Sequence, residues 1–195
     1  MKRALISVYD KTGVFSFAEE LCNRGFALIS TGGTYKMLKN AGIRAVKSVS
    51  DITEFPEILG SRIKTEHPKL MGGILALRNK KEHMQDLQKF GIKPIDMVVC
   101  NFYPFGKVIK QGVDLNTALE YIDIGGPNII RAAAKNFMSV IVVVNPRRYD
   151  QVLKELELNG DVSSETRKVL AVEAFKEAAR YDFEICRFLE KTFCL

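Results

Sequence analysis

Short apolar runs alternate with amphipathic stretches along most of the chain. A short continuous apolar run predicts a buried strand, whereas apolar residues that recur every three to four positions before a glycine predict a helix. On this basis we predict strands over residues 4–8, 26–30, 44–46, 74–77, 95–100 and 140–144. Helices are predicted over residues 14–24, 34–41, 80–90, 115–121, 127–136 and 146–158.

The remaining segments are less regular. A short helix is predicted to start at residues 51–54, which have the spacing of a capping box, and residues 60–73 are expected to form an exposed loop. Ser164 is expected to cap a long helix that ends near Thr192. The apolar residues of this helix form a stripe that must face its own domain or a partner: Val169, Val172, Phe175, Ala179 and Phe183.

Strands that alternate with helices across short connections are typical of a parallel sheet covered by helices on both faces. We therefore predict an α/β fold with a doubly wound, mainly parallel sheet. Residues 1–195 are expected to form a single domain, with residues 146–195 as its C-terminal helical part. In such sheets ligands bind beyond the carboxyl ends of the strands, so the loops at those ends are the first candidates for a functional site.

Composition agrees with a globular domain, since 47% of the 195 residues are hydrophobic and 27% are charged. The four cysteines lack the CxxC spacing of zinc or redox sites, so reduced thiols and a cytoplasmic protein are expected. The apolar run at residues 4–8 is too short for a signal peptide or a membrane span. The net charge of +6 indicates an anionic partner. The charge alone does not say whether that partner is nucleic acid, a membrane or a phosphorylated small molecule. Because basic residues do not cluster with interleaved aromatics, nucleic acid is not expected.

Two loops at predicted strand ends have the composition of phosphate sites. The loop from Ser7 to Gly13 places a hydroxyl and Lys11 before a helix N-terminus, where free N–H groups and the helix dipole favour an anion. The loop Ser30-Thr-Gly-Gly-Thr34 offers hydroxyls and two glycines that let the backbone approach a ligand. Neither loop is a P-loop or a GxGxxG fingerprint, and each can instead be an ordinary helix cap.

Three further segments carry candidate side chains. Arg62 and Lys64 point the same way in an extended segment, which suits a phosphate or carboxamide but is also found in solvated basic loops. The aromatics of residues 101–105 can stack on a flat heterocycle or plug the end of the sheet. Asp123 precedes a helix and Lys135 lies near its end, so the two either share a proton transfer or serve as a cap and a surface charge.

Eight segments, in order along nearly the whole chain, resemble the inosine-monophosphate cyclohydrolase domain of the bifunctional purine-biosynthesis enzymes that also carry an AICAR formyltransferase domain. They are Ser7-Val-Tyr-Asp-Lys-Thr-Gly13, Ser30-Thr-Gly-Gly-Thr34, Arg62-Ile-Lys-Thr65, His67-Pro68, Gly72-Gly-Ile-Leu75, Cys100-Asn-Phe-Tyr-Pro-Phe105, Ile122-Asp-Ile-Gly-Gly126 and Arg131-Ala-Ala-Ala-Lys-Asn136. The resemblance implies a fold of the methylglyoxal-synthase type. It also implies the ring closure of formamido-imidazole-carboxamide ribotide (FAICAR) to inosine monophosphate, without metal or organic cofactor, in a homodimer.

The same resemblance assigns roles to residues. Lys64, with nearby N–H groups, is expected to polarise the formyl oxygen, and Tyr103 to complete the hydrogen-bond network. Asp123, with Lys135, is expected to handle the protons. The phosphate is expected to be held by Ser7, Lys11, Thr31, Gly33 and Thr34. The rest of the nucleotide site is expected to contain Arg62, Thr65, Asn101, Phe102, Ile124 and Gly125.

The sequence departs from the pattern of this family in two ways. Lys69-Leu-Met71 stands before Gly72, where the family often has an aromatic or histidine-bearing stretch, so any role for a histidine there is lost. The chain also ends at Leu195, about where the formyltransferase domain would begin, so we expect that domain to be absent and only the cyclohydrolase activity to be present. The alternative is a non-catalytic regulatory module of the same fold that binds a phosphate-bearing ligand.

Overall fold

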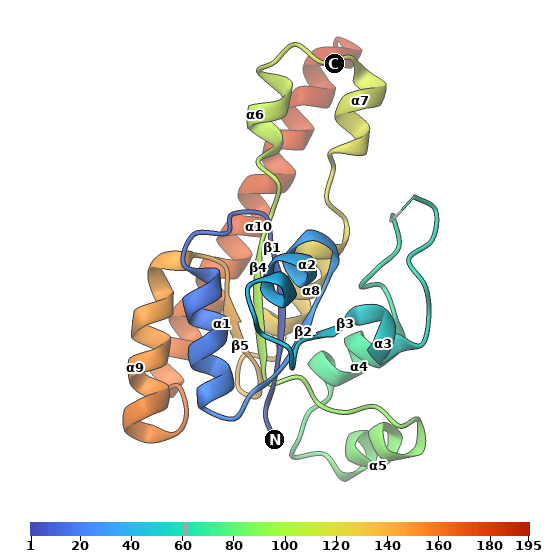
Figure 1. The fold of residues 1–195 in the computed structure, drawn as a ribbon. Coiled ribbons are helices and arrows are strands. Elements are labelled where there is room, and N and C mark those ends of the chain that lie inside the picture. The colour runs from blue at the N-terminus through green and yellow to red at the C-terminus, as the bar shows by residue number, and fades with distance from the viewer. Residues whose placement is uncertain (61) are drawn as a thin grey trace.

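The computed structural model describes residues 1–60 and 62–195. Its centre is a five-stranded sheet with the order β3-β2-β1-β4-β5, in which every neighbouring pair is parallel (Figure 1). The strands are β1 (Arg3–Val8), β2 (Ala27–Ser30), β3 (Lys47–Ser48), β4 (Met97–Asn101) and β5 (Ile141–Val143). The chain crosses from one side of β1 to the other between β3 and β4. Such a reversal of strand order is where doubly wound sheets bind their ligands.

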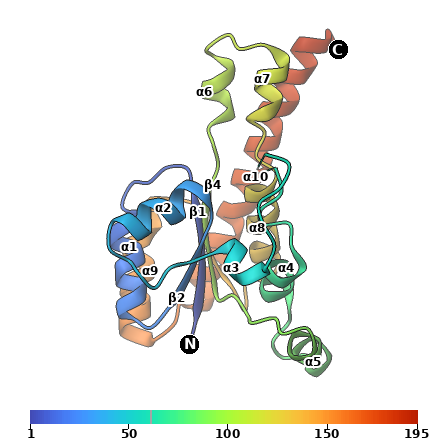
Figure 2. The same ribbon diagram turned by 45° about the vertical axis from the view of Figure 1, so that its right-hand side comes forward.

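Helices cover both faces of the sheet, as Figure 2 shows. One face carries α1 (Val14–Asn23), α2 (Gly32–Asn40) and α9 (Tyr149–Asn159), and the other carries α4 (Pro68–Leu75), α8 (Gly125–Lys135) and α10 (Ser164–Phe193). The connections contain α3 (Val49–Thr53), α5 (Lys81–Lys89), α6 (Phe105–Ile109), α7 (Leu115–Glu120) and the 3₁₀ turn η1 (Pro146–Arg148). The predicted doubly wound α/β fold is therefore confirmed. Over the described residues, no helix has the length and apolar character needed to cross a membrane.

The core lies where the central strands are covered on both faces. Ala4, Leu5 and Ile6 of β1 are fully buried, as expected of a strand between two helix layers. Ser7, one position before the end of this strand, is only half-buried. The carboxyl end of β1 therefore offers an accessible hydroxyl group.

Residues 68–75 form helix α4, so the exposed loop predicted over residues 60–73 and the strand predicted over residues 74–77 are wrong there. His67 caps this helix, since its Nδ1 accepts the Lys69 N–H at 3.1 Å, and Pro68 occupies the first turn. A Cβ on Gly73 would lie 2.7 Å from the carbonyl oxygen of Lys93. The second glycine of the Gly-Gly pair therefore allows close packing of a helix.

Three other boundaries differ from the predictions for local reasons. The edge strand is β3 and not residues 44–46. Ser48 then forms a capping box with Asp51, with N–H to oxygen distances of 2.9 and 3.0 Å, so α3 begins before residue 51. Ser163, and not Ser164, caps α10 by accepting the Thr166 N–H. Helix α6 is not among the predicted elements.

Helix α10 extends beyond the sheet, where α6 lies against it (Figure 1). Its buried face contains Leu170, Ala174 and Tyr181, and not the predicted apolar stripe. Val172 and Phe183 of that stripe are 53% and 62% exposed. The stripe is therefore largely exposed to solvent, although Phe175 contacts Arg131 of α8.

Candidate functional site

A cavity of about 630 Å³ opens at the carboxyl ends of β1 and β2. Its walls come from residues 62–66, residues 119–124 and the start of α8. Most of the predicted site residues line this one cavity: Ser7, Thr31, Arg62, Lys64, Thr65, Tyr103, Asp123, Ile124 and Gly125. The fold therefore brings together motifs that are far apart in the sequence.

Helix α2 begins at this cavity, and its first turn has no side-chain cap. Thr31 occupies the N-cap position, and its hydroxyl lies 2.8 Å from the Ser7 hydroxyl. Among the described residues, a Cβ on Gly33 would meet no atom within 4 Å outside its own helix and its chain neighbours, so a ligand can approach the backbone from that side. A Cβ on Gly32 would lie 4.0 Å from Lys64 Nζ, which places that positive charge near the same turn. Free N–H groups with an ammonium beside them suit a phosphate.

Lys11 and Thr34 attach the first loop to α2. The Thr34 hydroxyl donates to the Val8 carbonyl at 2.9 Å and accepts the Val8 N–H at 3.2 Å. Lys11 Nζ donates to the same hydroxyl at 3.0 Å and also to the Val8 carbonyl. Burial lowers the pKa of Lys11. These two residues do not line the 630 Å³ cavity, so their contact with a phosphate stays a prediction.

Asp123 lies at the start of α8, where its Oδ1 accepts the Gly126 N–H at 2.8 Å. Burial raises the pKa of this carboxyl, and the charge of Glu66 raises it as well, whereas the Gly126 hydrogen bond and Lys64 oppose the shift. Asp123 is therefore both a cap and a cavity residue. A carboxyl with a raised pKa in a cleft is a candidate for proton transfer.

Glu66 is a cavity residue that no sequence pattern singled out. Its Oε2 accepts the N–H groups of Lys64 and Thr65 at 2.9 and 3.0 Å, and its Oε1 accepts the Thr65 hydroxyl at 3.1 Å. A Cβ on Gly125 would lie only 2.6 Å from Glu66 Oε1. The carboxylate thus occupies two backbone donors beside Lys64.

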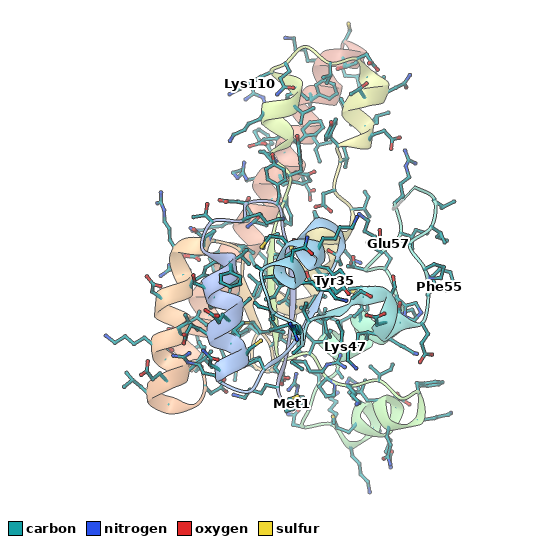
Figure 3. The ribbon with its side chains drawn as sticks, in the orientation of Figure 1. Met1, Tyr35, Lys47, Phe55, Glu57 and Lys110 are labelled. Atoms are coloured by element: carbon teal, nitrogen blue, oxygen red, sulfur yellow. The ribbon has the colours of Figure 1, made fainter. Side chains whose placement is uncertain are left out.

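Lys64 is the cation that faces these carboxylates. Its Nζ lies 4.0 Å from the Glu57 carboxylate, which comes from the segment after α3. Figure 3 labels Phe55 and Glu57 on this segment. Over the described residues this 4.0 Å contact is the one ion pair of Lys64, and an ammonium at such a distance from a carboxylate can reorient toward a ligand.

The aromatic segment after β4 has two roles. Phe102 and Phe105 are buried, so they plug the end of the sheet. Tyr103 lines the cavity, and its ring centroid lies 4.3 Å from that of Tyr9 and 4.9 Å from that of Tyr121. Desolvation, followed by the contact with Tyr9, raises the pKa of Tyr103, so its hydroxyl stays protonated and can donate a hydrogen bond.

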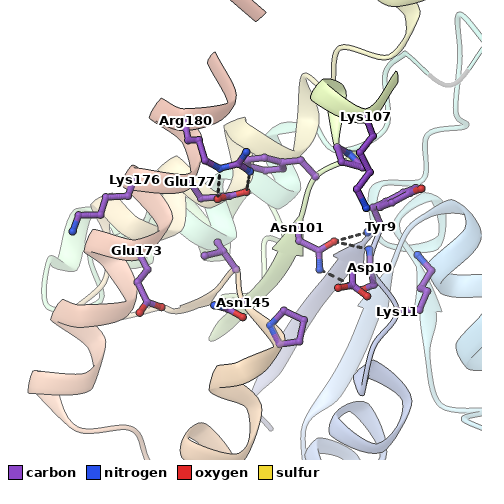
Figure 4. A pocket seen from close by; sticks show the side chains of 14 residues that line it. Tyr9, Asp10, Lys11, Asn101, Lys107, Asn145, Glu173, Lys176, Glu177 and Arg180 are labelled. Carbon is purple, nitrogen blue, oxygen red and sulfur yellow. Dashed lines mark hydrogen bonds and ion pairs between the residues drawn. The ribbon is translucent and has the colours of Figure 1, made fainter. Parts of the chain in front are cut away.

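Asn101 lines a neighbouring cavity of about 970 Å³, and its side chain holds the first loop, residues 7–13, in place (Figure 4). Its Oδ1 accepts the N–H groups of Tyr9 and Asp10, both at 2.8 Å. Lys11 and Phe102 line this larger cavity too. Several of its charged side chains are already paired, as in the Arg180–Glu177 and Arg148–Glu173 ion pairs, so the smaller cavity is the better candidate for chemistry.

Two of the predicted basic residues, Arg62 and Lys135, are exposed to solvent. Arg62 is exposed at the rim and pairs with Glu120. Lys135 is exposed in the last turn of α8, whereas Gly125 begins that helix at the cavity. Ten residues of helix span about 15 Å, so one chain does not bring Lys135 into the cavity with Asp123. Within the chain it is a surface cation at a helix C-terminus.

Known proteins match this chain along its length. The pattern of the MGS-like domain family matches residues 13–128, and that of the AICARFT/IMPCHase bienzyme family matches residues 133–194. The chain is 50% identical over 192 residues to the bifunctional purine biosynthesis protein PurH of Acetivibrio thermocellus. It is 51% identical over 190 residues to the protein of the same name from Listeria monocytogenes. The two alignments cover 98% and 97% of this chain but 37% of each relative.

A solved structure resembles the whole fold. The crystal structure of ForH superimposes with a TM-score of 0.85 at 35% sequence identity, covering 95% of both chains. The sheet, the helix layers and the C-terminal helix are therefore shared with a protein of similar length. The chain belongs to the MGS-like domain family, and its C-terminal helices continue with the sequence pattern of the AICARFT/IMPCHase bienzymes.

Proposed function

We propose that this chain is an inosine-monophosphate cyclohydrolase that converts FAICAR to inosine monophosphate with loss of water. The similarity to PurH proteins and to the AICARFT/IMPCHase family supports a place in purine biosynthesis. The observation that carries the proposal is one cavity in which Asp123 and Lys64 stand near the uncapped first turn of α2. Such a cavity suits a phosphorylated substrate that exchanges protons.

The proposed reaction has two stages. The carboxamide nitrogen attacks the formyl carbon, and a C–N bond forms as that nitrogen loses a proton and the formyl oxygen gains one. The resulting hydroxyl then leaves as water, while the former formamide nitrogen gives up its proton and the C=N bond of the new ring closes. Both nucleophile and electrophile are poor, so the site must orient them and stabilise the charge on oxygen.

The cavity residues divide these tasks. Asp123 accepts the carboxamide proton, because its buried carboxyl has a raised pKa that suits a general base. The Lys64 ammonium stabilises the oxygen charge, and the Tyr103 hydroxyl donates to the same group. Side chains alone supply these steps, in keeping with the expectation that no metal or organic cofactor takes part.

The remaining predicted residues bind the nucleotide in this proposal. The phosphate lies at the start of α2, where Ser7, Thr31 and Gly33 hold it. Lys11 and Thr34 support this end of the site from the first loop and from α2. Arg62, Thr65, Ile124 and Gly125 contact the rest of the ligand from the cavity wall. Asn101 and Phe102 contribute by holding the loops and the wall in place.

The direct test is incubation of the purified chain with FAICAR and measurement of inosine-monophosphate absorbance. Turnover that is unchanged by a chelator supports the proposal. No turnover with retained inosine-monophosphate binding would instead favour the regulatory module. No turnover and no nucleotide binding would remove both functions.

The exposed stripe on α10 suggests how two copies associate. We propose a cytoplasmic homodimer in which this stripe is part of the contact, because its large apolar side chains are 42–62% exposed on one helix and exposed apolar side chains that gather on one face mark interaction surfaces. Phe175 of the stripe lies next to α8, since the Arg131 guanidinium stands 5.9 Å from its ring centroid. An antiparallel pairing of the two α8 helices would bring Lys135 of each subunit toward the other subunit's Gly125. Light scattering on the purified chain measures the oligomeric state.

A further inference from the structure

Tyr181 of α10 contacts the backbone on which Asp123 stands. Its hydroxyl accepts the Asp123 N–H at 2.7 Å and lies 3.4 Å from the Tyr121 carbonyl oxygen, to which it donates. Tyr181 and Asp123 are separated by 58 positions in the sequence. One hydroxyl of α10 therefore bridges two backbone groups of the segment that leads into α8.

The ring of Tyr181 is held rigidly. It is 1% exposed, and its centroid lies 5.0 Å from that of Phe102 and 6.5 Å from that of Phe105. Phe102 follows β4 directly and Phe105 begins α6, so the ring packs between α10 and the segment at the end of the central sheet. The hydroxyl is thus a fixed point within the molecule.

The Asp123 segment has little freedom of its own once this contact is made. It lies between α7 and α8, and a Cβ on Gly126 would lie 2.8 Å from both Phe102 Cδ1 and Asp123 Oδ2. The Asp123 side chain bonds to Gly126 on one side, and its backbone N–H bonds to Tyr181 on the other. Asp123 is therefore held both through one oxygen of its carboxyl group and through its backbone N–H.

We propose that Tyr181 is a positioning residue for the reaction at Asp123, so that the C-terminal helix α10 is a working part of the active site. This inference rests on the proposed cyclohydrolase function. Tyr181 does not line the 630 Å³ cavity, so it acts through the backbone of Asp123 and not on the substrate. General-base catalysis depends on the distance between base and proton, so a small displacement of Asp123 lowers the rate more than it lowers binding.

The test compares Tyr181→Phe with Tyr149→Phe. The first variant keeps the ring contacts and removes only the hydroxyl. The second removes the hydroxyl of another buried tyrosine, which stacks on Phe17 in the helix layer on the other face of the sheet. Circular dichroism and thermal unfolding establish that both variants are folded at the assay temperature, and the assay temperature is lowered if Tyr181→Phe requires it.

For Tyr181→Phe we expect kcat to fall roughly ten- to a hundredfold, with KM within about twofold of the parent. The acid limb of its pH–rate profile should move to lower pH, because a looser segment lets water reach the Asp123 carboxyl and relieves its burial. The Tyr149→Phe variant should keep the parent kcat and profile. An unchanged kcat and pH profile in Tyr181→Phe would overturn the inference while leaving a working cyclohydrolase.

Hydrogen exchange supplies a readout that does not depend on turnover. The Asp123 amide should exchange faster in Tyr181→Phe than in the parent and in Tyr149→Phe, since it has lost its acceptor. If the parent turns over no FAICAR, the proposed function fails. The exchange comparison still shows whether the Tyr181 hydroxyl holds the Asp123 amide. Equal exchange in all three proteins would overturn the positioning role.

Discussion

Glu66 and Asp123 approach the start of helix α8 from two sides. A Cβ on Gly125 would lie 2.6 Å from Glu66 Oε1, and one on Gly126 would lie 2.8 Å from Asp123 Oδ2. The two glycines thus let two carboxyl groups share the positive end of one helix. Burial, and after it the Glu66 charge, raises the pKa of Asp123. Replacement of either carboxyl group should therefore affect the reaction in a different way.

Replacement of Asp123 by asparagine removes the proposed base but keeps a side-chain oxygen for the Gly126 N–H. We expect kcat to fall by roughly 10²- to 10⁴-fold, with inosine-monophosphate affinity within about threefold of the parent. Steady-state kinetics and calorimetric titration measure the two quantities. Asp86→Asn on the exposed side of α5 is the matched control. A kcat equal to that of the parent would show that another group takes the proton.

Replacement of Glu66 by glutamine changes the charge without changing the size. Because the Glu66 charge raises the pKa of Asp123, its removal should lower that pKa and move the acid limb of the pH–rate profile to lower pH. The rate in the parent falls as pH decreases through the Asp123 pKa, since the base is then protonated. A profile over the acid range, with Glu165→Gln as an exposed control on α10, measures the shift. A shift to higher pH would contradict the assignment.

Much of the fold and part of the site follow from local patterns. The apolar runs predict the central strands because a parallel sheet buries both faces, and its topology then places Ser7 and Thr31 at one edge. The prediction of a strand at residues 74–77 is wrong because a short apolar run does not distinguish a strand from a buried helix. The capping residue His67 and the proline after it are the local features that favour the helix.

The rest of the site depends on tertiary contacts that no spacing encodes. Glu66 enters the site because its segment folds against Gly125, and Tyr181 reaches Asp123 across 58 positions. The grouping of Lys135 with Asp123 reflects a motif that is continuous in sequence, whereas the helix between them separates the two ends. Phe102 is an aromatic residue that could stack on a heterocycle, but its ring is buried at the end of the sheet because Tyr181 packs on it.

Replacement of Lys11 by methionine tests the phosphate end. The substitution keeps the apolar stem and removes the ammonium that bonds to Thr34, so inosine-monophosphate affinity should fall roughly tenfold. Burial lowers the pKa of Lys11, so in the parent the affinity should also decline as pH rises through that lowered pKa. Calorimetric titration at several pH values measures both effects, with Lys36→Met on the exposed side of α2 as control. If the parent and Lys11→Met show the same affinity and pH dependence, Lys11 has only a structural role.

Subunit mixing tests whether Lys135 works across the proposed dimer. If Lys135 of the partner subunit completes each site, Lys135→Ala and Asp123→Asn homodimers should both be slow. A mixed dimer then contains one site with both native residues and one site with neither, so refolding the two variants together should restore up to about a quarter of the parent rate, because half of the dimers are mixed and half of their sites are intact. Phe175→Glu, placed in the exposed stripe, should shift light scattering toward the monomer mass and abolish the recovery. If mixing gives only the average of the two separate rates, Lys135 does not act in trans.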